Sequence, residues 1–162
     1  SGCLQALEIA DLFKRLNIKP KRTVRIVFFM SEEMGLQGAD VYGAVAAASG
    51  MNHIAAIEAD RGAGVPRAFN VTCEPAVLKK MQSWLPYLSK ALIERIQKGG
   101  SGGDVSRIKG TKALVGYVPD VQKYFDYHHS ENDIFSEVHP RELELGSAAM
   151  AILVYLISEN GL

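Results

Sequence analysis

The chain has 162 residues, and its 18 lysines and arginines equal its 18 aspartates and glutamates, so its formal net charge is zero at pH 7. This length fits one domain with a sizeable hydrophobic core. The even charge balance gives no indication of binding to nucleic acid or to an anionic membrane surface. No apolar stretch is both long enough and free enough of charge to span a bilayer.

The cysteines and the start of the chain give no information on its compartment. Cys3 and Cys73 lie far apart and form no CxxC pair, so they indicate neither a disulfide framework nor a redox environment. The chain begins at Ser1, within a predicted helix start and without an initiator methionine or a signal peptide. We therefore expect that the natural N-terminus, with any targeting signal, precedes this sequence.

The first 50 residues predict a helix, a buried strand and a second helix. Apolar residues at helical spacing place the first helix between Ser1 and Asn17. Val24–Met30 is a short apolar run rich in β-branched and aromatic residues, which is typical of a strand buried on both faces of a parallel sheet. A second helix of small residues then ends at Ser49-Gly50 and can pack closely on that sheet.

Strands and helices also alternate in the rest of the chain. We expect strands at 53–57, 68–72 and 111–118, a long helix at 75–97, an irregular stretch at 120–136 and a last helix from Pro140 to about Asn160. There are no repeats and no internal linker. The pattern therefore predicts a single layered α/β domain over residues 1–162 with a largely parallel sheet.

Carboxylates directly follow two of the predicted strands. Glu32 and Glu33 come after Val24–Met30, and Asp60 comes after the strand at 53–57, so all three would lie at the sheet edge where sites form. Adjacent side chains point in different directions, so one glutamate can bind a metal while the other faces the bound water, as metal-assisted hydrolysis requires. The alternative is that Glu32 and Glu33 are both solvated at the start of the next helix, where the helix dipole favours negative charge.

Two adjacent histidines, His128 and His129, lie in the irregular stretch after the last predicted strand. Oxygen and imidazole ligands without thiolates suit catalytic zinc or a related divalent ion. Each residue also has a plainer interpretation, because Asp60 could cap a turn and the histidines could form a solvated loop pair. The glycine-rich run at 99–103 lacks the GK[ST] ending of a phosphate loop, so we reject nucleotide binding there.

Four segments in this order resemble the co-catalytic two-zinc exopeptidases, a family that includes secreted aminopeptidases, and within it the plasma glutamate carboxypeptidase (carboxypeptidase Q)-like branch. The segments are 24–38, 57–62, 102–104 and 124–133. The resemblance covers nearly the whole chain. It implies a three-layer sandwich with a mostly parallel central sheet flanked by helices, with the N-terminal part of the domain missing.

The same resemblance implies a role for each site residue. Glu32 would be the general base, Glu33 and His129 would bind one zinc, Asp60 would bind the other, and His128 would be a neighbour. Three further carboxylates would at most orient these groups, namely Glu58, Asp104 and Asp133. Ile134 stands where family members usually have threonine, which removes any hydroxyl contact there.

The implied activity is zinc-dependent hydrolysis of dipeptides or peptide ends by a metal-activated water. The family site has two further ligands, a histidine and a bridging aspartate, and we expect both to precede Ser1. This chain alone would then hold its two zinc sites empty or partly filled and would be inactive. Alternatives are a non-catalytic binding or dimerisation domain of the same fold, or a two-metal deacylase. By resemblance only, we expect a secreted or periplasmic protein. Formation of a homodimer is compatible with this expectation.

Overall fold

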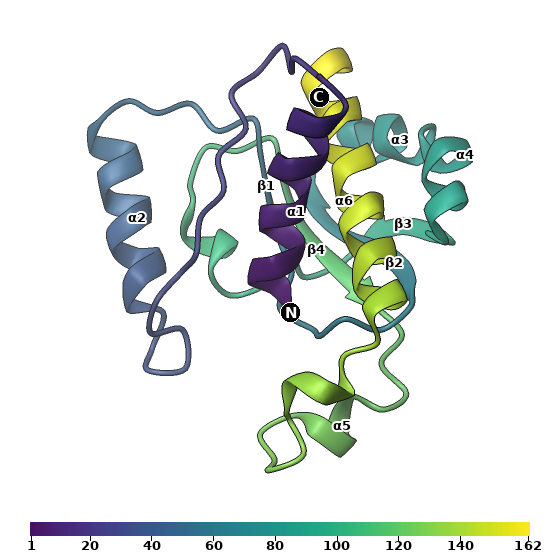
Figure 1. Ribbon diagram of the computed structural model, residues 1–162. Helices are drawn as coiled ribbons and strands as arrows, with labels where there is room; N and C mark the ends of the chain where they lie inside the picture. Colours follow the sequence, from purple (N-terminus) through teal and green to yellow (C-terminus); the bar gives the residue numbers. More distant parts are fainter.

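The computed structural model describes all 162 residues. Thirteen helices and strands follow one another along the chain (Figure 1), and their bounds are α1 (Gly2–Arg15), α2 (Gln37–Ala48), β1 (Ala55–Glu58), β2 (Pro66–Cys73), α3 (Pro75–Gln82), α4 (Leu85–Leu88), η1 (Ser89–Ala91), β3 (Arg95–Lys98), η2 (Val105–Arg107), β4 (Ala113–Pro119), α5 (Tyr124–Tyr127), η3 (Phe135–Glu137) and α6 (Pro140–Asn160).

The four strands form one open sheet in the order β1-β4-β2-β3. Two of its pairings are parallel, β1 with β4 and β2 with β3, whereas β2 and β4 run antiparallel. Helices flank the sheet, so the predicted α/β class with a mostly parallel central sheet is confirmed. No helix has the length and apolar character needed to cross a membrane.

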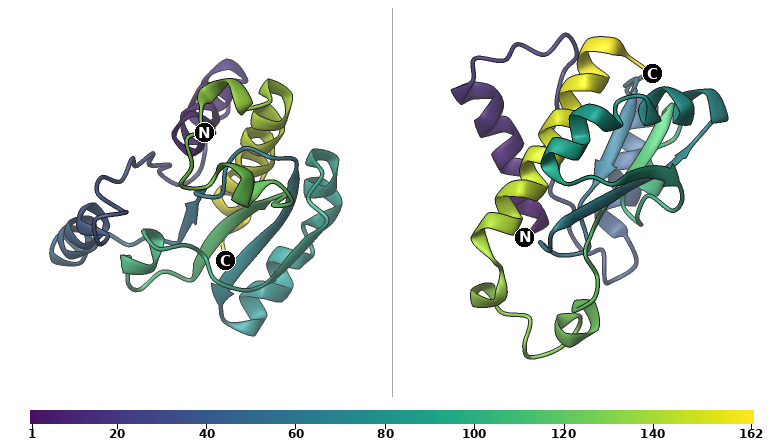
Figure 2. Two further views of the ribbon diagram at one scale, coloured as in Figure 1. Left: turned by 90° about the horizontal axis from the view of Figure 1, so that it is seen from below. Right: turned by 90° about the vertical axis from the view of Figure 1, so that its right-hand side faces the viewer.

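Side-chain alternation along the strands separates a hydrophobic face from a face that carries acidic groups. On β4, Val115 and Tyr117 enter a core formed with α1, α3, α4 and α6, and Phe69 of β2 is fully buried in the same core. The right-hand view of Figure 2 shows α1 and α6 together on one side of the sheet. Because successive strand residues point to opposite faces, Ile57 of β1 packs against this core while Glu58 points to the other face.

The other face of the sheet is covered by the loop at 99–110, by η2 and by α2. Glycines permit the close approach. A Cβ at Gly116 of β4 would lie 2.7 Å from the carbonyl oxygen of Ser101, and a Cβ at Gly43 of α2 would lie 2.5 Å from that of Arg107. The loop is therefore packed directly on β4, and Glu58 lies beneath it.

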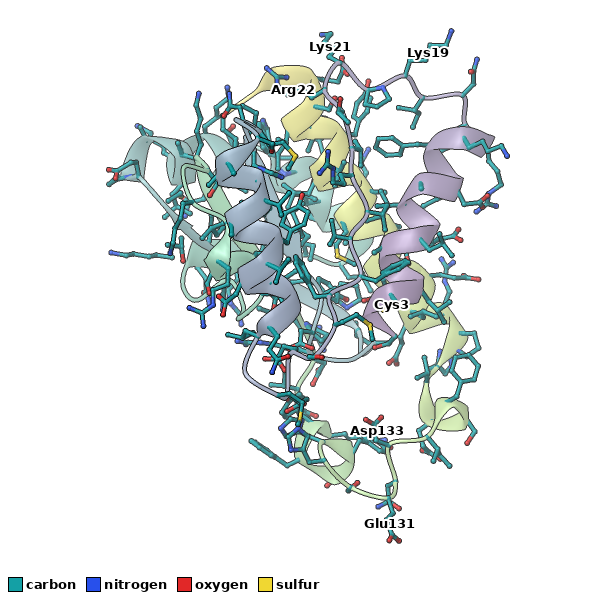
Figure 3. All side chains as sticks on the ribbon, turned by 90° about the vertical axis from the view of Figure 1, so that its left-hand side faces the viewer. Cys3, Lys19, Lys21, Arg22, Glu131 and Asp133 are labelled. Atoms are coloured by element: carbon teal, nitrogen blue, oxygen red, sulfur yellow. The ribbon has the colours of Figure 1, made fainter.

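The run Val24–Met30 is not a strand, which corrects the first strand prediction. Its start is tied to the end of α6, where the Arg22 N–H donates to the Ser158 hydroxyl at 3.2 Å (Figure 3). None of its residues is buried, and Met30 is 73% exposed. An apolar run becomes a strand only where another strand takes its backbone hydrogen bonds, and no strand in this chain lies along it. The outer edge of β1 is likewise unpaired.

The long helix predicted at 75–97 is also wrong. α3 ends at Gln82, and a separate short helix, α4, begins with Pro86 in its first turn. Proline has no N–H for an interior helical bond but fits a first turn, so the helix restarts there. Leu92 then adopts a left-handed φ of 65°, and the chain continues as β3 beside β2. The other predicted elements are present, with ends shifted by a few residues.

Candidate functional site

The Glu32-Glu33 turn is held by backbone hydrogen bonds and by unusual backbone angles. The N–H groups of Gly35 and Leu36 donate to the carbonyl oxygen of Glu32 at 3.0 and 2.9 Å. Ser31 and Leu36, which flank the two glutamates, have φ values of 62° and 60°. Non-glycine residues adopt this left-handed region at a cost of order 1–3 kcal/mol, and such residues cluster at functional sites.

His129 lies against this turn although 96 residues separate it from Glu33. Its Nε2 is 2.9 Å from Oε1 of Glu33, and both side chains are mostly exposed. His129 itself has a φ of 54°. The adjacent His128 instead stacks on Tyr124, with ring centroids 4.5 Å apart. The structure thus brings together the two residues that the resemblance assigned to one zinc, although their role as ligands stays a proposal.

Asp60 follows the end of β1 and lies within the electrostatic influence of Glu33. Burial raises its pKa, and the negative charge of Glu33 raises it further, whereas Arg61 and His128 lower it. Because the negative charge of Glu33 acts on Asp60, a cation placed between the two carboxylates would be stabilised. Asp60 is therefore available as a ligand beside Glu33.

Behind these residues, Glu58 and Asp104 are buried acidic side chains. They are 8% and 7% exposed, and each has one carboxylate oxygen without a hydrogen-bond partner. The Val105 N–H donates to the other oxygen of Glu58 at 2.8 Å. Burial raises the pKa of Glu58 to about 6, with a further increase from the negative charges of Asp104 and Asp60. Burial also raises the pKa of Asp104, followed by the charges of Glu32 and Asp60.

Glu32 lies between the exposed pair and the buried acids. Its Oε1 is 3.3 Å from the position of a Cβ on Gly103, so the absence of a side chain there leaves room for the carboxylate. The negative charge of Glu32 also raises the pKa of Asp104. The side chain of Glu32 is half-buried and makes no hydrogen bond in the chain, so it is free to accept a proton from a small molecule.

A cavity of about 240 Å³ opens beside Asp60. Nine residues line it, namely Glu58, Asp60, Arg61, Ser101, Gly102, Gly103, Gly116, Tyr117 and Tyr124. Arg61 was not predicted to be a site residue, since its only sequence signal was its position directly after Asp60. Asp133, labelled in Figure 3, was predicted at most to orient ligands. Its carboxylate is exposed and forms no hydrogen bond or ion pair.

The donor set fits zinc in chemistry, although it forms no complete cluster in this chain. Two ligands on one tetrahedral zinc, each about 2.0–2.2 Å from the metal, lie roughly 3.3 Å apart. The 2.9 Å separation of the Glu33 oxygen and the His129 nitrogen is close to that value. No three histidine, cysteine, aspartate or glutamate side chains converge closely enough to hold a metal ion by themselves.

Comparison with known proteins identifies the family. The family model described as Peptidase family M28 matches residues 1–154. The chain therefore belongs to peptidase family M28, and the family expected from the sequence motifs is confirmed.

Individual relatives agree with this assignment. The chain is 27% identical over 159 residues to carboxypeptidase Q from Bos taurus and 26% identical to that from Homo sapiens, in each case over 98% of this chain and 34% of the relative. The crystal structure of a peptidase M28 precursor from Shewanella amazonensis SB2B matches with a TM-score of 0.90 and 26% identity, over 99% of this chain and 37% of that one. This chain thus spans about a third of the length of these relatives.

Proposed function

We propose that this chain forms part of a zinc-dependent exopeptidase that hydrolyses dipeptides or peptide ends. The observation that supports this most directly is the contact between His129 and Glu33, at 2.9 Å, beside Asp60 and an unengaged Glu32. Membership of peptidase family M28 and the similarity to carboxypeptidases Q agree with the proposal.

Each residue has a distinct part in the proposed reaction. Glu33, His129 and Asp60 would hold zinc, which supplies a Lewis acid that activates water and polarises the scissile carbonyl. Glu32 accepts the proton of the attacking water and then donates it to the leaving amine. The Glu32 carboxylate makes no hydrogen bond in this chain, so its oxygens are available for this purpose. Glu58 and Asp104 lie behind the ligands and would fix their positions.

Two substitutions separate the base from the ligands. In the intact gene product that contains this chain, Glu32→Gln should abolish dipeptide hydrolysis while leaving the zinc content nearly unchanged, because the amide cannot accept a proton. Glu33→Ala should lose both zinc and activity. The measurements are dipeptide hydrolysis and zinc content by mass spectrometry. Glu131→Gln, an exposed glutamate at the tip beyond α5, is the matched control (Figure 3).

Other outcomes would favour the alternatives. If Glu32→Gln keeps near-normal activity, the assignment of the base is wrong. If the unsubstituted protein binds no zinc and hydrolyses no peptide, a non-catalytic binding or dimerisation domain of the same fold is the better explanation. Hydrolysis of N-acyl amino acids in place of dipeptides would favour a two-metal deacylase.

A further inference from the structure

Arg61 is the only positively charged residue among the nine that line the cavity beside Asp60. The other charged residues of this lining, Glu58 and Asp60, are acidic. The Arg61 side chain is exposed and forms no hydrogen bond or ion pair within the chain. A guanidinium with five N–H donors and no partner, set in the wall of a cavity, is available to bind an anionic group.

The backbone that carries Arg61 is anchored at the end of the sheet. The Tyr117 hydroxyl donates to the carbonyl oxygen of Gly64 at 3.3 Å, and the Asp120 N–H donates to that of Val65 at 2.7 Å. A Cβ at Gly64 would lie 2.7 Å from the carbonyl oxygen of Asp120, so the loop is packed directly against the end of β4. The loop that begins at Arg61 is therefore held against the sheet at its far end, at Gly64 and Val65.

The reach of Arg61 limits which anion it can bind. Arg61 and Asp60 line the same cavity, and the positive charge of Arg61 lowers the pKa of Asp60, so the guanidinium serves groups close to the proposed metal ligands. A residue of an extended peptide spans roughly 3.3–3.6 Å. When the scissile carbonyl lies at the ligands, the C-terminal carboxylate of a dipeptide is only one residue away, whereas that of a longer peptide lies farther out.

We propose that Arg61 determines specificity by binding a substrate carboxylate one residue beyond the scissile bond, an inference that rests on the proposed function. This carboxylate is the free C-terminal carboxylate of a dipeptide. Guanidinium and carboxylate match in a planar, two-bond geometry. The cavity volume of about 240 Å³ suits a single amino acid residue better than a long ligand, since typical small-molecule pockets measure about 300–1,000 Å³. A dipeptide amide would lose this contact.

The test compares matched substrates in zinc-loaded, intact protein. Alanyl-alanine carries a C-terminal carboxylate, and alanyl-alanine amide carries no carboxylate. Alanyl-glutamate amide carries a carboxylate only on its side chain. The unsubstituted protein should prefer the acid over the neutral amide by about ten- to a hundredfold in kcat/KM, as for a hydrogen bond to a charged group. Arg61→Met should abolish this preference mainly through KM, and Arg61→Lys should keep part of it. Arg95→Met, at an exposed arginine of β3, is the matched control.

A second measurement does not depend on turnover. In the Glu32→Gln background, calorimetry should show tighter binding of alanyl-alanine than of its amide, and Arg61→Met should remove the difference. If the preference survives Arg61→Met in both measurements, the proposal is overturned. If Arg61 affects only the acidic side-chain substrate, Arg61 binds a carboxylate but the C-terminal assignment is wrong. If the protein with Glu32 intact binds alanyl-alanine through Arg61 but does not hydrolyse it, only the exopeptidase proposal is overturned. If no substrate is bound or hydrolysed, both proposals are overturned.

Discussion

Replacing Glu58 by glutamine should stabilise this chain at neutral pH, although the substitution removes a buried, hydrogen-bonded carboxylate. Glu58 is 8% exposed, and one of its oxygens has no partner. The carbonyl oxygen of glutamine can still accept the hydrogen bond that Val105 donates at 2.8 Å. The substitution therefore keeps the size and the main contact of the side chain and removes only its charge.

The magnitude follows from the pKa of Glu58. Burial, with a smaller contribution from Asp104 and Asp60, raises this pKa from 4.5 to about 6. A pKa change of one corresponds to about 1.36 kcal/mol, so ionising Glu58 costs the folded chain about 2 kcal/mol more than the unfolded chain. Because the folded state binds the proton more tightly, the stability from this group is fully present below pH 4.5 and is lost as the pH rises through about 6.

The assay is urea unfolding of the metal-free chain, followed by the fluorescence of its single tryptophan, Trp84. Above pH 6, Glu58→Gln should raise the free energy of unfolding by up to about 2 kcal/mol, and below pH 4.5 the two proteins should agree. Glu131→Gln should have no effect at either pH. If Glu58→Gln instead destabilises the chain equally at both pH values, the charge of Glu58 does not account for the difference between the two proteins and the argument is refuted.

Two further predictions concern packing and use the same unfolding assay. Gly146→Ala in α6 should lower the free energy of unfolding by about 1–3 kcal/mol through overpacking, because the new methyl group would meet the buried side chain of Gln5 and lie 2.8 Å from the Tyr117 hydroxyl oxygen. Gly100→Ala, with no atom within 4 Å, should change it by less than about 0.5 kcal/mol, and an equal effect of both would contradict the packing argument. Phe69→Ala should cost about 3–5 kcal/mol because Phe69 is fully buried. Phe125→Ala, at a side chain that is 85% exposed, should cost less than about 0.5 kcal/mol. A loss as large as that of Phe69→Ala would contradict the link between burial and stability.

The backbone angles at the candidate site help to separate function from folding. Non-glycine residues with positive φ occur at five positions, and three of them, Ser31, Leu36 and His129, belong to the Glu32-Glu33 turn or to the histidine that contacts it. Strained residues persist where the surrounding structure fixes them. Their concentration at this turn agrees with a pre-arranged site, which the zinc and hydrolysis measurements above test directly.

The sequence by itself determined the elements whose signals are local. Helical spacing and end signals predicted α1, α2 and α6, and short β-branched runs predicted β1, β2 and β4, because these patterns depend only on neighbouring residues. The order of the acidic and histidine motifs was enough to predict the family. It was also enough to name Glu33 and His129 as partners, since that inference came from the motifs and required no distance.

Only the tertiary structure decided what depends on residues far apart in the chain. Val24–Met30 has the composition of a strand, but strand formation needs a neighbour, and none lies along it. Residues 95–97 of β3 were assigned to a helix by their local pattern, yet β2 pairs with them. The burial of Glu58 depends on the loop at 99–110, and the place of Arg61 in the cavity wall depends on the anchoring of its loop by Tyr117 and Asp120. Burial and pairing are properties of the assembled chain, and local sequence patterns do not contain them.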